Sequence, residues 1–292
     1  MPRPTFFITD VFTDKKYGGN PLATFIDCEK LSSHDMQNIA KEINFSETTF
    51  ILSREATENG YPVRIFTPRA EIDFAGHPTL GTAYVIRHLL KLTAANEIRL
   101  HLNIGTIPVH FSEQNSFLWM QQMSPIFGKQ AQIHDIAPIL GLSPADFNPN
   151  FSIQEVSTGL PTLIVPLAHQ AALKQIHIHK TLYFSWAASS WAKLILAFCP
   201  SGYEANQALS ARVFGDFYGI PEDPATGSSN GALAAYLSQH AFFEKKEIDL
   251  LVGQGYEINR PSTLALKTEC AQNILKVFVG GNVVTIAQGI WG

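Results

Sequence analysis

Charged residues are scarce in this chain of 292 residues, where they account for 16% of the sequence, against about 25% in average soluble proteins. No run of lysine or arginine is longer than two residues, so the chain lacks the basic stretches with which proteins bind nucleic acids or anionic membranes. The 21 basic and 25 acidic residues give a net charge of −4. We therefore expect the partner to be a small neutral or acidic organic molecule, and neither a nucleic acid nor a membrane.

Cysteine is equally rare. Cys28, Cys199 and Cys270 form no CxxC or CxxH pair, which disfavours both a disulfide framework and a thiolate zinc site. We interpret all three as small buried hydrophobic residues. No apolar run approaches the ~20 residues that a bilayer-spanning helix needs, and the N-terminus lacks the apolar core of a secretory signal. The sequence therefore predicts a soluble, cytoplasmic protein.

The sequence does contain many short stretches rich in Val, Ile, Phe or Thr and bounded by Gly, Pro, Asn or Ser, a pattern typical of β-strands. One of these predicted strands covers residues 182–186. Helical patterns are fewer, and we predict helices over residues 34–42, 78–90 and 228–239. The last two are apolar nearly all round, as helices buried on every side are. Since the chain is about twice as long as a usual domain, we expect two sheets, each wrapped around one central helix.

Two segments 150 residues apart resemble each other and open the two apolar helices. Residues 73–81 read Asp-Phe-Ala-Gly-His-Pro-Thr-Leu-Gly, and residues 223–231 read Asp-Pro-Ala-Thr-Gly-Ser-Ser-Asn-Gly. The corresponding pairs are Asp73 and Asp223, Ala75 and Ala225, Thr79 and Ser229, and Gly81 and Gly231. We interpret the match as an internal duplication, with Pro125–Gly128 as the predicted hinge between the halves.

Each repeat delivers a glycine-containing turn to the start of a helix. Backbone N–H groups there are unpaired and the helix dipole adds roughly half a positive charge, so such a turn suits a carboxylate or another anion. If the halves face each other, both turns converge on one cleft, where His77 follows Gly76 in the first turn and Asp223 precedes the second. The alternative is that both are ordinary helix starts whose Gly and Ser residues act only as caps.

Glu47 is a candidate general base because it lies between Phe45-Ser46 and Thr48-Thr49-Phe50. A carboxylate in such surroundings is partly desolvated, which raises its pKa toward that of a useful base. The alternative is a solvated loop glutamate, and the local pattern alone favours that interpretation.

His177 and His179 alternate with isoleucine, so a strand would place both rings on one face, as a metal-dependent hydrolase requires. Because no third ligand is near them in the sequence, an ordinary polar strand face is the favoured interpretation. We therefore predict no metal site.

Several short motifs follow one another along the whole chain. They are Val11-Phe-Thr, Gly19-Asn-Pro-Leu-Ala23, Asn44-Phe-Ser-Glu-Thr-Thr-Phe50, Phe66-Thr-Pro68 with Glu71, Phe74-Ala-Gly-His-Pro-Thr-Leu-Gly81, Glu222-Asp-Pro-Ala-Thr-Gly-Ser228, Gly253-Gln-Gly255, Arg260-Pro-Ser262 and Gly289-Ile-Trp291. In this order they resemble the PhzF-like family, which is named for the phenazine-biosynthesis isomerase.

The resemblance implies the diaminopimelate-epimerase-like fold of the α/β (α+β) class. In this fold two pseudo-symmetric halves each roll a sheet around a central helix, and the active site lies between them. The C-terminal strand commonly returns to the first half. We therefore expect the halves to be residues 1–124 with 281–292, and residues 125–280.

The resemblance also assigns roles to residues. In the PhzF-like pattern the acid–base group is the glutamate of Ser-Glu-Thr, here Glu47, and the substrate-binding aspartate is Asp223. His77 joins Asp223 in orienting the substrate or relaying protons. The donors of hydrogen bonds to the substrate are Gly76, Gly227 and Ser228. The implied activity is that of an isomerase or epimerase without a cofactor, which moves a proton on a small carboxylic acid, and a homodimer is expected.

Two alternatives stay open on the same fold. A non-catalytic binding or interaction protein would use the same donors to hold an anion without converting it. A thiol-dependent racemase would need a cysteine at each helix start. The two starts read Ala75-Gly-His77 and Ala225-Thr-Gly227, so this second alternative is disfavoured.

Overall fold

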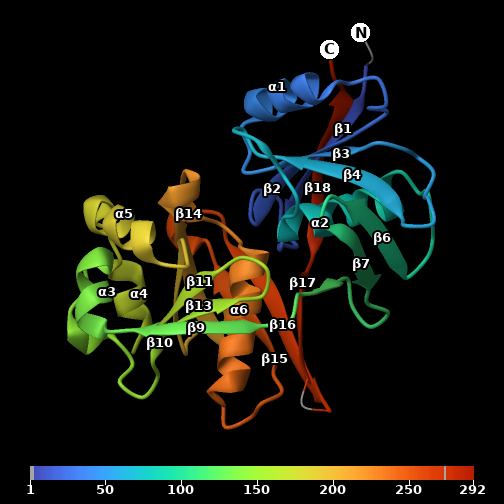
Figure 1. Ribbon diagram of the computed structural model, residues 1–292. Helices are drawn as coiled ribbons and strands as arrows, with labels where there is room; N and C mark the ends of the chain where they lie inside the picture. The colour runs from blue at the N-terminus through green and yellow to red at the C-terminus, as the bar shows by residue number, and fades with distance from the viewer. Residues whose placement is uncertain (1–2, 273) are drawn as a thin grey trace. The chain divides into compact units, whose positions relative to one another are not determined.

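The short β-rich stretches of the sequence form strands in two units, shown together in Figure 1. The structure is a computed structural model that describes residues 3–272 and 274–292. One unit consists of Met1–Met120 with Gly280–Gly292, and the other of Gln121–Val279. No helix among the described residues is long and apolar enough to cross a membrane.

The first unit contains a sheet that combines strands from the beginning and from the end of the chain. Its strands are β1 (Thr5–Val11), β2 (Asn20–Ile26), β3 (Thr48–Ile51), β4 (Tyr61–Phe66), β5 (Glu71–Ile72), β6 (Glu97–Leu102), β7 (Gly105–Phe111), β8 (Leu118–Gln121) and β18 (Val283–Ile290). Its helices are α1 (Ser33–Ile43), α2 (Gly76–Tyr84) and η1 (Val85–Leu89), a π-helix that continues α2. The first and last strands of the chain, β1 and β18, pair antiparallel.

The second unit has a larger set of helices. Its strands are β9 (Ile126–Ala131), β10 (Ile153–Ser157), β11 (Thr162–Pro166), β12 (Leu194–Cys199), β13 (Leu209–Gly215), β14 (Ile220–Asp223), β15 (Asp249–Gln254), β16 (Ser262–Ala271) and β17 (Ile274–Gly281). Its α-helices are α3 (Ile133–Leu140), α4 (Gln170–Gln175), α5 (Lys180–Ser189) and α6 (Gly227–Gln239). Its 3-10 turns are η2 (Pro144–Asp146), η3 (Asp216–Tyr218) and η4 (Tyr256–Ile258).

Strand pairing follows the same order in the two units. In the first, β1 is antiparallel to β2, β2 parallel to β3, β3 antiparallel to β4, β4 parallel to β6, and β6 antiparallel to β7. In the second, β10 to β13, β15 and β16 repeat these five relations. In the first series α2 precedes the fifth strand, β6, and in the second series α6 precedes the fifth strand, β15. The predicted fold class and its repeated architecture are therefore confirmed.

The helices α2 and α6 are the central helices of their units. Every residue of α2 except Tyr84 is buried, and so is all of α6 except Ser228 and Gln239. Polar side chains on them find partners on the sheet: Thr82 of α2 donates to Thr49 at 2.8 Å, and Ser229 of α6 bonds Thr162 at 2.9 Å. Each bond gives a buried hydroxyl the partner that it needs, and it also holds the helix against its sheet.

The helix α1 lies on the other face of the first sheet (Figure 1). Ser32 caps it through a capping box with Asp35, the arrangement that satisfies two unpaired N–H groups at once. Its apolar stripe of Met36, Ile39 and Ala40 packs against aromatic side chains of β2, β3 and β4. The helix predicted over residues 34–42 is confirmed.

The strand predicted over residues 182–186 is wrong, because this stretch lies inside α5. Its residues Leu-Tyr-Phe-Ser-Trp have high β-propensity, which is a weak preference that packing overrides. His179 accepts a hydrogen bond from the Leu182 N–H and so caps the helix. Tyr183 and Ala187, four residues apart, bury one side of it in an apolar cluster with α3 and α4, and Figure 1 shows these three helices grouped together.

Candidate active site

Glu47 lies directly before β3, on the turn that follows α1. The turn begins at Asn44, whose left-handed backbone (φ 57°) ends α1 and redirects the chain toward the sheet. The Glu47 side chain is only 14% exposed, and its Oε2 atom lies 3.5 Å from Nε2 of His77. The candidate base is therefore largely removed from water and faces an imidazole.

His77 is neutral. Burial lowers the pKa of its imidazole from 6.5 to about 3, against a smaller opposing effect of a hydrogen bond with the backbone of Pro21. Proline offers only a carbonyl oxygen, so the ring is the donor. Nε2 of His77 has no hydrogen-bond partner among the described residues, which makes Nδ1 the donor. A neutral ring with its proton on Nδ1 turns the lone pair of Nε2 toward Glu47, so their contact is not an ion pair.

The start of α2 carries the His77 ring. Gly76 and His77 are the first two residues of the helix and both are buried. Ala75 before them is extended and provides no side-chain cap. Because the first N–H groups of a helix have no acceptor inside it and the helix dipole is positive there, this turn suits an anion.

Asp223 ends β14 and is held at the start of α6 by two side chains. The Thr226 hydroxyl donates to Oδ2 of Asp223 at 2.5 Å. The Gln254 amide donates to the Asp223 carbonyl at 2.7 Å and to the Thr226 hydroxyl at 3.1 Å. A carbonyl oxygen only accepts, so the orientation of the Gln254 amide is fixed. The Thr226 hydroxyl therefore takes a hydrogen bond from Gln254 and directs its own proton to the carboxylate.

The same Gln254 side chain ties the helix to the sheet. It is fully buried, and its Oε1 atom accepts from the Thr226 N–H at 3.3 Å and from the Asn230 amide at 2.8 Å. Two donated and two accepted bonds use all the capacity of this amide. Gln254 thus joins β14, β15 and the first turn of α6 into one polar network.

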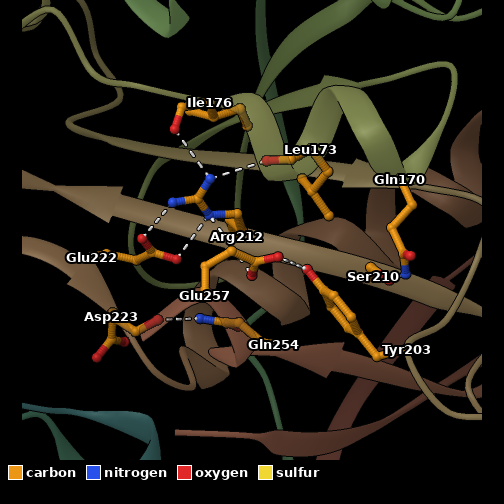
Figure 2. Close-up of polar contacts among 10 residues, drawn as sticks. All are labelled: Gln170, Leu173, Ile176, Tyr203, Ser210, Arg212, Glu222, Asp223, Gln254 and Glu257. Atoms are coloured by element: carbon orange, nitrogen blue, oxygen red, sulfur yellow. Dashed lines mark hydrogen bonds and ion pairs between the residues drawn. The ribbon is translucent and has the colours of Figure 1, made fainter. Parts of the chain in front are cut away.

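A buried ion pair holds the residue before Asp223. The Arg212 guanidinium makes two hydrogen bonds to Glu222, at 2.9 and 2.7 Å, and two more to the carbonyls of Leu173 and Ile176. Figure 2 shows Arg212 between these groups and Glu257. The Glu257 carboxylate accepts a hydrogen bond from the Tyr203 hydroxyl. Both Arg212 and Glu222 are at least nine-tenths buried, and a bidentate pair of this kind fixes geometry as well as charge. Neighbouring Asp223 consequently projects from a firmly anchored strand.

The structure brings the predicted site residues together in two groups. Glu47, Gly76 and His77 form the group of the first unit. The group of the second unit lies at the start of α6 and consists of Asp223, Gly227 and Ser228. Thr226 provides no side-chain cap to α6 either, so both helix starts share the same chemistry.

His177 and His179 do not lie on a strand, so that prediction is wrong. They precede α5, and Nδ1 of His179 accepts the hydrogen bond that caps this helix. Within residues 3–272 and 274–292, no group of three or more His, Cys, Asp or Glu side chains is placed to hold a metal ion.

The cysteines differ from one another. Cys28 and Cys199 are buried as predicted, and burial raises the pKa of the Cys28 thiol to about 12 and that of Cys199 above its ordinary value. Cys270 is exposed, so its predicted burial is wrong; it lies near the end of β16, where side chains reach solvent. Raised thiol pKa values disfavour a nucleophilic role for the two buried cysteines.

Two residues of the network at α6 have no role in the sequence-based prediction. Thr226 lies inside the Pro-Ala-Thr-Gly motif, and Gln254 is the centre of Gly253-Gln-Gly255. The signal that could have pointed to Gln254 is a polar side chain between two glycines at the end of an apolar strand, where a buried amide needs partners.

Comparison with known proteins now decides the family. The profile of the family described as phenazine biosynthesis-like protein, PhzC-PhzF, matches residues 9–289. The chain belongs to this family. A trans-2,3-dihydro-3-hydroxyanthranilate isomerase from Pseudomonas chlororaphis is 35% identical over 290 residues, which cover 97% of this chain and 98% of that protein. Because PhzF-family relatives over nearly the full length are named isomerases, the chain is an isomerase.

Solved structures agree with this assignment. A PhzF-family phenazine biosynthesis protein from Bacillus anthracis superposes with a TM-score of 0.91 at 27% identity, covering 99% of each chain. A hydroxyproline epimerase from Agrobacterium vitis has a TM-score of 0.64 at 8% identity, covering all of this chain and 94% of the other. The similarity to the hydroxyproline epimerase is one of fold alone.

Proposed function

We propose that this PhzF-family isomerase works without a cofactor and moves a proton between carbon atoms of a small carboxylic acid, with Glu47 as the group that removes and returns it. The observation that carries the proposal is the contact of the shielded Glu47 carboxyl with the neutral ring of His77. A carboxylate can take a proton from one carbon and return it to another on the same face of a bound ring.

We propose that the neutral ring of His77 serves as the acceptor for a proton that Glu47 takes up. When Glu47 has taken a proton, its O–H can donate to the lone pair of Nε2, whereas the bare carboxylate faces that lone pair without a proton between them. The ring thus holds the transferred proton close to the substrate and away from water. Donation to Pro21 keeps the ring in the required tautomer.

The two helix starts would bind the substrate. Gly76 at α2, and Gly227 with Ser228 at α6, supply N–H donors for a carboxylate and for negative charge that develops during proton removal. Asp223, oriented by Thr226, would accept a hydrogen bond from a hydroxyl or amino group.

Isotope exchange tests the proposal directly. The Pseudomonas chlororaphis relative is named for trans-2,3-dihydro-3-hydroxyanthranilate, and we use this compound as the probe acid. In deuterium oxide the wild-type protein is expected to convert it and to place deuterium at a carbon atom, measured by mass spectrometry and NMR without added metal or cofactor. Binding of the probe acid without any carbon exchange would contradict the proposal and favour a binding protein.

A homodimer is a further proposal, supported by the family resemblance alone. Light scattering is expected to give twice the mass of the 32.2 kDa chain, and the mass of one chain would refute it.

A further inference from the structure

Gln122 buries an amide group that has no hydrogen-bond partner in the described part of the protein. The residue is 6% exposed, and neither Nε2 nor Oε1 of its side chain is bonded. Its backbone N–H is paired, since it donates to the Val277 carbonyl at 2.8 Å. Buried amides are almost always paired, because removing them from water without a partner is unfavourable. An unpaired amide in this position is therefore one that a bound molecule can complete.

The side chain of Gln122 lies against α6. A Cβ atom added to Gly231 would stand 2.9 Å from Cγ and 3.0 Å from Oε1 of Gln122, and 2.6 Å from the Thr158 hydroxyl. Thr158 in turn donates to the Ser228 carbonyl in the first turn of the helix. Gln122 and Thr158 thus occupy the space that any side chain at Gly231 would need.

The face of α6 that Gln122 touches leads directly to the start of the helix. Gly231 and Gly227 are four residues apart, so they lie on one face and are separated by about 6 Å along the axis. Both are glycine, and no side chain of these two residues stands between the Gln122 amide and the Gly227 N–H. A molecule bound at the start of α6 therefore lies about one helical turn from the position that Gln122 contacts.

We propose that Gln122 is a further substrate-binding residue, which uses its amide to bond the acid held at the start of α6. Nε2 donates to an oxygen of the carboxylate, and Oε1 accepts from a neighbouring hydroxyl or amino group of the same molecule. The assignment rests on the proposed function for the identity of the ligand. Gly231 serves this role by letting the amide approach the helix.

The test uses the variant Gln122→Leu of the full chain, with Gln121→Leu as the matched control because Gln121 is the exposed neighbour. If the amide serves a ligand, Gln122→Leu raises the melting temperature by about 2–4 °C, because it removes an unpaired buried amide. In the same variant KM for the probe acid rises at least about tenfold, and kcat changes less. Gln121→Leu changes neither quantity. Gln122→Met, of similar length, is expected to repeat both effects.

Two results would overturn the assignment: an unchanged KM in Gln122→Leu, or a fall in melting temperature, which would mean that the amide stabilises the fold.

Binding of the probe acid, measured by calorimetry, distinguishes failure of this assignment from failure of the proposed function. Should Glu47→Gln keep wild-type exchange, the proposed base would be wrong, yet Gln122→Leu would still weaken binding of the probe acid. Should exchange depend on Glu47 while the affinity of Gln122→Leu equals wild type, only the role of Gln122 would fail.

Discussion

The imidazole of His77 faces the carboxyl group of Glu47 at 3.5 Å, and it does so as a neutral ring whose other nitrogen donates to Pro21. A charged ring would hold Glu47 as a permanent carboxylate through an ion pair. A neutral ring instead offers an acceptor for a proton on Glu47, as the proposed function requires. The contact fits the proposed role of Glu47 as the group that takes up and returns a proton.

Neutrality of His77 predicts its titration. Because burial lowers its pKa to about 3, the ring is expected to stay neutral from pH 8 down to about pH 4. Its nitrogen and carbon chemical shifts, assigned by their loss in His77→Asn, report this directly. A midpoint for His77 between pH 6 and 7 would contradict the account.

The same shift makes stability depend on pH. Between about pH 3 and 6.5 the unfolded chain binds a proton at this position and the folded chain does not, so the free energy of unfolding falls as the pH is lowered through this window. The expected contribution is about 1.4 kcal/mol for each pH unit. Denaturant titrations of wild type and His77→Asn should differ by this slope, and parallel slopes would refute the prediction.

Removing the Thr226 hydroxyl tests how Asp223 is oriented. Thr226→Val keeps the shape of the side chain but takes away the proton that is donated to Asp223, so KM for the probe acid is expected to rise about tenfold. Thr226→Ser retains the hydroxyl and should stay within about twofold of wild type. Equal KM values for the valine and serine variants would show that the hydroxyl does not matter.

The buried pair of Arg212 and Glu222 makes a prediction about stability. Arg212→Met leaves a buried carboxylate without its partner and is expected to cost about 3–5 kcal/mol of unfolding free energy. The matched control is Arg54→Met, which breaks an equally bidentate but exposed pair with Asp27 and should cost less than about 1 kcal/mol. Similar losses in the two variants, measured by denaturant titration, would contradict this difference.

Much of the fold was predictable from local patterns. The two apolar helices and the repeat that opens them were enough to expect two sheets around central helices, because a helix without a polar face has to be buried. The strand predicted over residues 182–186 failed because aromatic residues fit strands and buried helix faces alike. Only tertiary contacts of Tyr183 and Ala187 decided the outcome.

The site was predictable only in part. Glu47, His77 and Asp223 stand in recognisable motifs, but the local pattern around Glu47 did not reveal that it faces His77, a contact between distant parts of the sequence. Gln122 carried a weaker signal: Leu118 and Met120 are buried on β8 and Gln121 is exposed, so alternation points Gln122 inward. That its amide would meet a glycine face of α6 depends on the packing of separate segments.

The most direct measurement is the rate of carbon–deuterium exchange in Glu47→Gln, read together with the affinity for the probe acid. We expect exchange to fall by at least about a thousandfold while the dissociation constant from calorimetry stays within a few fold of wild type. The matched variant Glu42→Gln, at an exposed position of α1, should exchange at the wild-type rate. Exchange at the wild-type rate in Glu47→Gln would show that another group moves the proton.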